Sequence, residues 1–166
     1  TSSVVGASAG VAIARPERRN DHEIELVAVI GKAGRHIRAA DALSHVAGYC
    51  VGLDMTVRGP EERSMRKSPD GYTVLGPWLT TADEMTTPGA LSMRLHVDQE
   101  LRQDANTSDL ILGVTDLIVF ASRFYSLHPG DLIFTGTPQG VGPIAPGQTL
   151  RAEIQGLGTL QTQVQP

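Results

Sequence analysis

The chain has 166 residues and a formal net charge of −4, from 14 Lys+Arg against 18 Asp+Glu. Hydrophobic residues at 40% and charged residues at 19% are close to globular averages, which excludes a disordered or collagen-like chain. No apolar run approaches the ~18 residues of a membrane span, the mild acidity argues against non-specific nucleic-acid binding, and the single Cys50 excludes an internal disulfide framework.

We expect no signal peptide in these residues, because the sequence after Thr1 lacks a charged segment followed by an apolar one. We therefore expect a cytoplasmic protein with neither a membrane nor a nucleic acid as partner. The length suits one domain over residues 1–166. The 18 Gly and 10 Pro imply many tight turns, which favours a β-rich architecture.

The first half of the chain predicts strands separated by turns. The expected elements are a short strand at 11–14, a strand at 22–30, a short helix at 39–47, a strand at 49–57 and a loop or helical turn at 58–71. Alternation along 22–30 places Ile24, Leu26 and Ala28 on one face, with Glu23 and Glu25 on the other. Gly48 is expected to end the short helix.

The second half predicts one long helix among further strands. The expected elements are a strand at 91–97, a turn at 98–99, an amphipathic helix at 108–126 capped by Thr107 or Ser108, a strand at 131–135, a Gly/Pro-rich loop at 136–147 and two final strands flanking 156–158. Apolar residues recur at three- and four-residue steps in the helix. With about seven or eight strands, the fold class is α+β, mostly β.

Three carboxylates stand out chemically. Glu23 and Glu25 point the same way from a strand, about 7 Å apart, next to an apolar run that indicates burial on both faces. Asp54 ends a second apolar strand. Buried like charges need compensation by a cation or by hydrogen bonds, and three hard oxygen ligands without cysteine favour Mg²⁺ or Mn²⁺. The simpler alternative is an edge strand with one solvated face, and an Asp54 that organises a turn.

Short motifs then occur in a specific order: H-E-I-E-L at 22–26, D-M-T-V-R at 54–58, and T-G-T-P-Q-G-V-G at 135–142. This series resembles the fumarylacetoacetate hydrolase family, in its C-terminal catalytic domain, over about residues 1–166. The resemblance implies a mixed β-sandwich roll that forms a homodimer.

The same resemblance implies roles for individual residues. It implies that Glu23, Glu25 and Asp54 bind Mg²⁺ or Mn²⁺ and that Lys67 is catalytic, in contact with substrate and metal-bound water. Gly136 and Thr137 would hold a substrate carboxylate. Arg58 is a further substrate-binding candidate through its bidentate guanidinium; the alternative is a structural brace for Glu61 or Glu62.

Some positions depart from the family pattern. Gly59 replaces the final Asp of the D-x-[ST]-x-R-D motif, Gly71 stands where Thr is common, and the interval from Asp54 to Lys67 is short. The His–Glu pair of an N-terminal lid, which carbon–carbon hydrolases of the family use, has no match in these residues.

The resulting hypothesis is a divalent-metal-dependent hydrolase, decarboxylase or isomerase. It would act on a 2-oxo acid, either an acylpyruvate or an oxo-dicarboxylate, through a metal-bound enolate, as in the catabolism of aromatic compounds. The alternatives are a catalytically silent domain or subunit that binds metal and carboxylates, and a purely structural β-roll.

Several other residues have simpler interpretations. His22 neighbours Glu23 but points to the opposite strand face. The other histidines are expected at the surface; they are His36, His45, His96 and His128. Trp78 is expected as a core or interface anchor, and Cys50 as a small buried residue.

Overall fold

The computed structural model describes residues 2–85 and 87–166. Its strands are β1 (Val4–Gly6), β2 (Val11–Ala12), β3 (Asn20–His22), β4 (Ile24–Ile30), β5 (Val46–Asp54), β6 (Thr56–Val57), β7 (Thr73–Thr81), β8 (Ser92–Val97), β9 (Glu100–Asn106), β10 (Leu132–Phe134), β11 (Gly142–Pro143), β12 (Thr149–Ile154) and β13 (Gly158–Gln165). The helices are α1 (Arg63–Lys67) and α2 (Val114–Phe124), with 3-10 turns at Ala7–Ala9, Ala39–His45 and Thr107–Asp109. The predicted α+β, mostly β class is confirmed.

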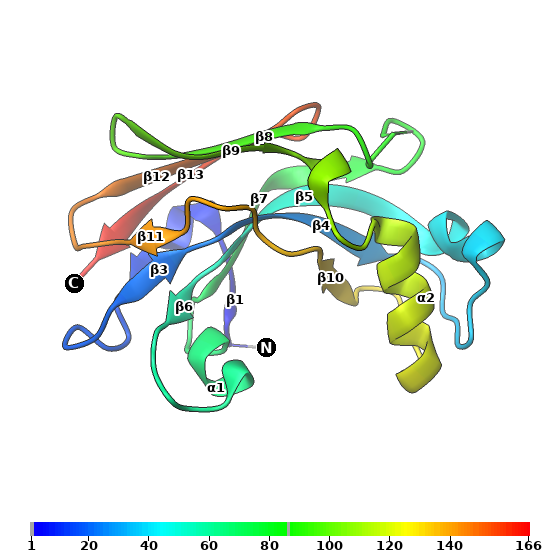
Figure 1. The fold of residues 1–166 in the computed structure, drawn as a ribbon, viewed down its shortest axis with the longest axis horizontal. Helices are drawn as coiled ribbons and strands as arrows, with labels where there is room; N and C mark the ends of the chain where they lie inside the picture. The colour runs from blue at the N-terminus through cyan, green and yellow to red at the C-terminus, as the bar shows by residue number, and fades with distance from the viewer. Residues whose placement is uncertain (1, 86) are drawn as a thin grey trace.

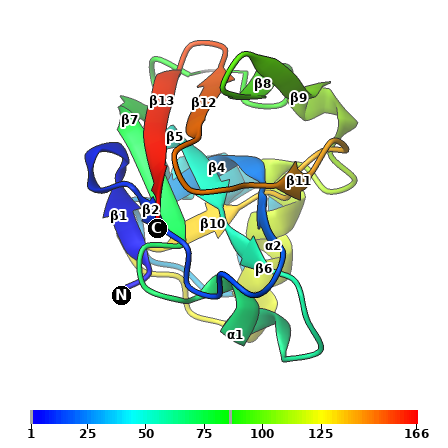
Figure 2. The same ribbon diagram turned by 90° about the vertical axis from the view of Figure 1, so that its left-hand side faces the viewer.

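Two five-stranded sheets form the body of the molecule. The central sheet has the order β1-β7-β5-β4-β10, the second β2-β13-β12-β8-β9, and a three-stranded sheet β11-β3-β6 lies at one end. The sheets are mixed, because β1 pairs with β7 and β2 with β13 in parallel while the other pairs are antiparallel. Figure 1 shows the second sheet stacked over the central one, and Figure 2 shows the sheets curling into a roll.

The core lies between the sheets, and its pattern follows from the alternation of side chains along each strand. In β8, Met93, Leu95 and Val97 are buried while Ser92 and Arg94 are exposed, as predicted. Burying such a side chain contributes about 1.5–3 kcal/mol. Strand β4 is covered on both faces, since every residue but Val29 is buried. The apolar part of β4 therefore anchors the acidic residues at its start.

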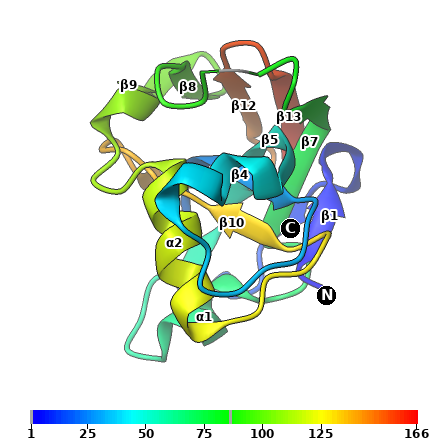
Figure 3. The same cartoon turned by 90° about the vertical axis from the view of Figure 1, so that its right-hand side faces the viewer.

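The two helices lie on the side of the central sheet away from the second sheet (Figure 1). Figure 3 shows α2 beside β4 and β10. Ser122 of α2 ties the segment before Ala39–His45 to the helix, because its hydroxyl accepts from the Ile37 amide at 3.0 Å. In the described part of the chain, neither helix has the length and apolar character that crossing a membrane requires.

The predicted helix at 108–126 is too long at its start. A capping box formed by Asn106 and Asp109 closes the short turn Thr107–Asp109, and α2 begins only after Gly113. Thr107 does not cap α2; it is buried, and its hydroxyl accepts from the Leu91 amide at 2.8 Å. The apolar residues at 110–111 therefore continue the pattern of the helix but lie before its start.

Other expectations for the first half need correction. Gly48 does not end a helix but lies within β5, where a Cβ atom would collide with the carbonyl oxygen of Thr80 in β7. His45 is buried, and its Nδ1 lies 2.9 Å from the Lys32 carbonyl oxygen. Trp78 is 59% exposed and therefore is not a core residue. Cys50 is buried as predicted.

Candidate metal and substrate site

The three predicted carboxylates meet where β4 and β5 pair. Glu23 lies between β3 and β4, Glu25 pairs with Gly52, and Asp54 ends β5. The Asp54 amide donates to the Glu23 carbonyl at 2.9 Å, which closes the strand ends together. One carboxylate oxygen from each residue lies within 4.8 Å of the others. Antiparallel pairing thus joins residues that are distant in the sequence.

Two of these carboxylates are almost fully removed from water, and Asp54 is partly buried. Glu23 and Glu25 are 6% and 4% exposed. Burial raises the pKa of Glu25 to about 7, although a hydrogen bond from the Gly136 amide, at 2.6 Å, favours the charged form. Burial also raises the pKa of Asp54. Both shifts arise chiefly from burial, which disfavours the charged form of a carboxylate.

Lys67, on α1, is the nearest cation to the cluster. Its Nζ donates to Glu23 Oε2 at 2.7 Å and to Asp54 Oδ2. Burial lowers the pKa of Lys67, but the hydrogen bonds to Asp54 and Glu23 outweigh it and raise the pKa overall. Lys67 is therefore held in its charged form between two of the carboxylates.

Arg58 approaches the cluster from the other side. Its Nη2 donates to Glu23 Oε1 at 2.8 Å, and its Nε donates to Asp21 Oδ2 at 2.7 Å. Asp21 is fully buried, yet Arg19 and Arg58 hold its pKa below the usual range. Sequence reasoning missed Asp21, although its position two residues before Glu23 was a usable signal. Arg58 thus braces nearby acids, as the alternative interpretation held, but its partners are Asp21 and Glu23 rather than Glu61 or Glu62.

Arg18 forms that brace instead, and this explains one departure from the family pattern. Its Nη1 donates to Glu61 Oε1 at 2.6 Å. A Cβ atom at Gly59 would collide with the Arg18 guanidinium, so the small residue leaves room for it. Gly71 has φ of +76°, a conformation that favours glycine over threonine.

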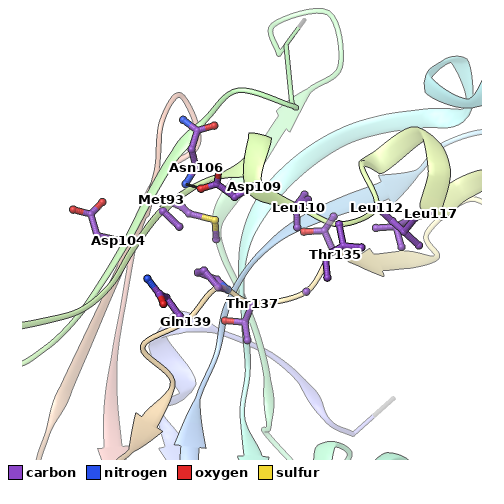
Figure 4. A pocket seen from close by; sticks show the side chains of 14 residues that line it. Met93, Asp104, Asn106, Asp109, Leu110, Leu112, Leu117, Thr135, Thr137 and Gln139 are labelled. Carbon is purple, nitrogen blue, oxygen red and sulfur yellow. Dashed lines mark hydrogen bonds between the residues drawn. The ribbon is translucent and has the colours of Figure 1, made fainter.

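The loop after β10 brings the remaining predicted residues next to the carboxylates. Gly136 donates its amide to Glu25, and Thr137 Oγ1 accepts from Gln103 Nε2 at 2.8 Å. Gly136 and Thr137 also line a cavity of about 600 Å³, seen in Figure 4, whose wall is completed by Met93 and Leu110. A second hollow of about 270 Å³ touches Asp54 and Lys67. The smaller hollow thus reaches the carboxylate cluster at Asp54, and the larger cavity reaches the loop whose amide donates to Glu25.

The donor set fits a divalent cation. Three carboxylate groups supply hard oxygen ligands of the kind that Mg²⁺ and Mn²⁺ prefer. Their burial and the raised pKa of Glu25 indicate uncompensated negative charge. The described residues offer no cysteine or histidine in this cluster, which disfavours zinc.

Comparison with known proteins agrees with this geometry. The profile of the family described as "Fumarylacetoacetate (FAA) hydrolase C-terminal" matches residues 1–165. A maleylpyruvate hydrolase of Aquipseudomonas alcaligenes is 62% identical over 159 residues, which are 96% of this chain and 55% of that protein. A 4-hydroxyphenylacetate degradation bifunctional isomerase/decarboxylase of Salmonella dublin is 42% identical over 148 residues, 86% of this chain and 34% of that protein.

A solved structure gives the same result for the fold. The maleylpyruvate hydrolase from Sphingobium sp. SYK-6, in complex with manganese(II) and pyruvate, superposes with a TM-score of 0.94 at 42% identity. The match covers 99% of this chain and 61% of that one, and the chain spans about half the length of its 62% identical relative. The chain belongs to the fumarylacetoacetate hydrolase family.

Proposed function

We propose that residues 1–166 form a single catalytic domain of a Mg²⁺- or Mn²⁺-dependent enzyme. Its substrate would be a 2-oxo acid, and its first reaction the hydrolysis of an acylpyruvate such as maleylpyruvate. The observation that carries this proposal is the convergence of two buried carboxylates and a partly buried third with Lys67, beside a loop that faces a cavity. The name of the 62% identical relative supports the substrate class.

In this proposal Glu23, Glu25 and Asp54 bind the cation. A bound divalent ion supplies a Lewis acid that favours negative charge on a carbonyl oxygen of the substrate. Lys67 donates hydrogen bonds from a charged ammonium group, because Glu23 and Asp54 keep it protonated. A donor fixed in advance stabilises negative charge as it develops during reaction. Lys67 is therefore the proposed catalytic residue.

The substrate carboxylate is assigned to the loop after β10. Gly136 and Thr137 line the larger cavity, and a neutral hydroxyl binds an anion without competing for the carboxylate ligands. Arg58 is predicted to attract the same substrate, since its guanidinium adds positive charge beside Glu23. In these roles the negative end of the substrate meets hydrogen-bond donors and a cation rather than the carboxylates themselves.

Decarboxylation or isomerisation of a related 2-oxo acid is the second candidate. The specific observation in its favour is the 42% identity with a bifunctional isomerase/decarboxylase. The three reactions give different products from one bound acid, so product analysis distinguishes them. Hydrolysis of an acylpyruvate releases pyruvate and a carboxylic acid, whereas decarboxylation releases carbon dioxide.

The test is metal removal and restoration on the purified chain. Protein treated with EDTA should lose turnover of maleylpyruvate, fumarylpyruvate, oxaloacetate and hydroxyheptadienedioate, followed by ultraviolet absorbance. Mn²⁺ or Mg²⁺ should restore turnover of at least one of these acids. Turnover that EDTA does not reduce and added metal does not raise contradicts the proposal. Tight binding of oxalate with Mn²⁺, but no turnover of any acid, would identify a catalytically silent domain instead.

We also propose a homodimer that works in the cytoplasm. The end of helix α2 exposes an aromatic cluster of Phe120 and Phe124, with Tyr125 directly after the helix; they are 54%, 61% and 68% exposed. Contiguous exposed apolar side chains are typical of protein contacts. Light scattering should give twice the mass of one chain, and Phe124→Ser should lower it. A monomer in both proteins refutes the dimer.

A further inference from the structure

Gln103 connects the metal-binding strand to the loop that faces the cavity. This residue lies in β9, and its side chain is fully buried. Its Oε1 accepts from the Ile24 amide at 3.2 Å and lies 3.1 Å from His22 Nδ1. Its Nε2 donates to Thr137 Oγ1 at 2.8 Å and to the Pro138 carbonyl at 3.0 Å. One carboxamide thus joins residues on either side of Glu23 to the loop.

The contacts at the two ends of this carboxamide fix its orientation. The Ile24 amide can only donate, and the Pro138 carbonyl can only accept. A flipped carboxamide would place donor against donor at Ile24 and acceptor against acceptor at Pro138. In the unflipped orientation, Oε1 faces His22 Nδ1 and can only accept. Nδ1 of His22 therefore carries the proton. Burial lowers the pKa of His22, in agreement with a neutral ring.

This orientation decides what Thr137 presents to the cavity. Its oxygen already accepts from Gln103, so its own proton cannot point along that bond. Among the described residues, no hydrogen-bond acceptor receives the Thr137 proton. Thr137 lies at the cavity wall, as Figure 4 shows. The hydroxyl proton is therefore available to a ligand in the cavity.

We propose that Gln103 is a positioning residue that makes Thr137 a hydrogen-bond donor toward the carboxylate of the bound 2-oxo acid. The inference rests on the proposed function for the identity of the ligand, and Gln103 itself does not touch it. Gln103→Glu reverses the arrangement, because a carboxylate accepts from Thr137 and turns the hydroxyl oxygen toward the anion. Gln103→Met removes the donor without adding charge.

The experiment is calorimetric titration of Mn²⁺ alone, and then of oxalate into the Mn²⁺-loaded chain. Gln103→Glu should weaken oxalate binding at least about tenfold, because it replaces an attractive contact with a repulsive one. Gln103→Met should weaken it by about threefold or more. Mn²⁺ affinity should stay within about threefold in Gln103→Met, which neither touches the carboxylates nor adds charge, and should be equal or higher in Gln103→Glu, which adds a negative charge near the ligands.

Thr137→Val provides the readout that a merely structural role would not change. Because Gln103 acts through the Thr137 hydroxyl, the uncharged Gln103→Met in the Thr137→Val background should change oxalate affinity by less than about twofold. An equal loss in both backgrounds overturns the inference, and so does unchanged oxalate affinity in Gln103→Glu. Gln99→Glu, an exposed change in the turn before β9, is the matched control and should behave as wild type.

Thermal melts of each variant without metal show whether the fold is kept. If Gln103→Glu does not fold, Gln103→Met in the two Thr137 backgrounds decides the question by the same comparison. Absence of oxalate binding by the wild-type chain with Mn²⁺ would overturn the proposed function, and this inference with it. Oxalate binding that is strong in wild type and equally strong in Gln103→Met overturns only the role of Gln103.

Discussion

Replacing Glu25 by glutamine should stabilise the metal-free protein and remove its response to metal. Glu25 is 4% exposed, and its pKa of about 7 stands against an ordinary value of 4.5. The folded state therefore binds this proton more tightly than the unfolded state, and ionising Glu25 opposes folding. A difference of this size corresponds to roughly 3 kcal/mol at about pH 8. Glutamine keeps an oxygen for the Gly136 amide but carries no charge.

The sign of the pH dependence follows directly. Between about pH 4.5 and pH 7 the folded protein holds the Glu25 proton while the unfolded chain has lost it, so this group makes stability fall as pH rises. Glu25→Gln lacks this dependence. Its advantage should be largest at about pH 8, where it raises the melting temperature by roughly 6–12 °C, and should approach zero near pH 5.

Metal should cancel most of this difference in stability. At a Mn²⁺ concentration about one hundred times its dissociation constant, binding stabilises the wild-type fold by roughly 2.7 kcal/mol. Glu25→Gln has lost one of three carboxylate ligands, so its melting temperature should barely respond. Urea titrations at about pH 5 and pH 8, with EDTA or with Mn²⁺, measure all these free energies of unfolding.

Glu62→Gln is the matched control, since Glu62 is an exposed glutamate that caps no amide at the start of α1. It should leave the free energy of unfolding and the Mn²⁺ response unchanged. The reasoning is refuted if Glu25→Gln is less stable than wild type at about pH 8 in EDTA, or if Mn²⁺ stabilises it as much as wild type.

Three further substitutions test the surroundings of the cluster. Lys67→Met should cut turnover at least about a hundredfold, and normal turnover would contradict its catalytic role. Its Mn²⁺ affinity, measured by calorimetry, should be unchanged or higher, because the ammonium group no longer competes for two carboxylates. Arg58→Leu should lower the free energy of unfolding by about 2 kcal/mol in urea titrations near neutral pH, since buried Asp21 keeps only one partner. This loss should shrink as pH falls toward the ordinary pKa of Asp21. An unchanged free energy of unfolding would show that the brace is not needed. Gly59→Asp should change stability by less than about 1 kcal/mol, because only the flexible end of Arg18 must move; a larger loss would mean that Arg18 is fixed in place.

The parts of the fold that sequence predicted best are those with a strong alternation or a long apolar run. Strand β4 follows from the run after Glu25, and β8 from its alternating burial. Strand β7 was not predicted, although it runs next to β5 in the central sheet. Its Gly76-Pro77 pair is typical of turns and edges. Tertiary pairing on both sides of β7 overrides that local preference.

The residues of the site also differ in how well the sequence predicts them. The carboxylates could be predicted because buried like charges are chemically unusual wherever they occur. The partners of Gln103 could not, since Ile24 and His22 are 79 and 81 residues away in the sequence. A glutamine in a strand has no signal that distinguishes an exposed side chain from a buried one. Only the packing of β9 against the start of β4 reveals its contacts.

Strand register is the feature that makes one site out of these separate signals. Glu25 pairs with Gly52, and a Cβ atom at Gly52 would collide with Val27 and Phe134 side chains. A slip of one residue would turn Glu25 and its neighbours to the opposite face and would bring Leu53 opposite Glu25. The apolar residues of β4 and β5 resist that slip, because they would lose their places in the core. Burial of the core thus stabilises the register that keeps the carboxylates close despite their mutual repulsion. The binding site for a cation can therefore form in the metal-free protein.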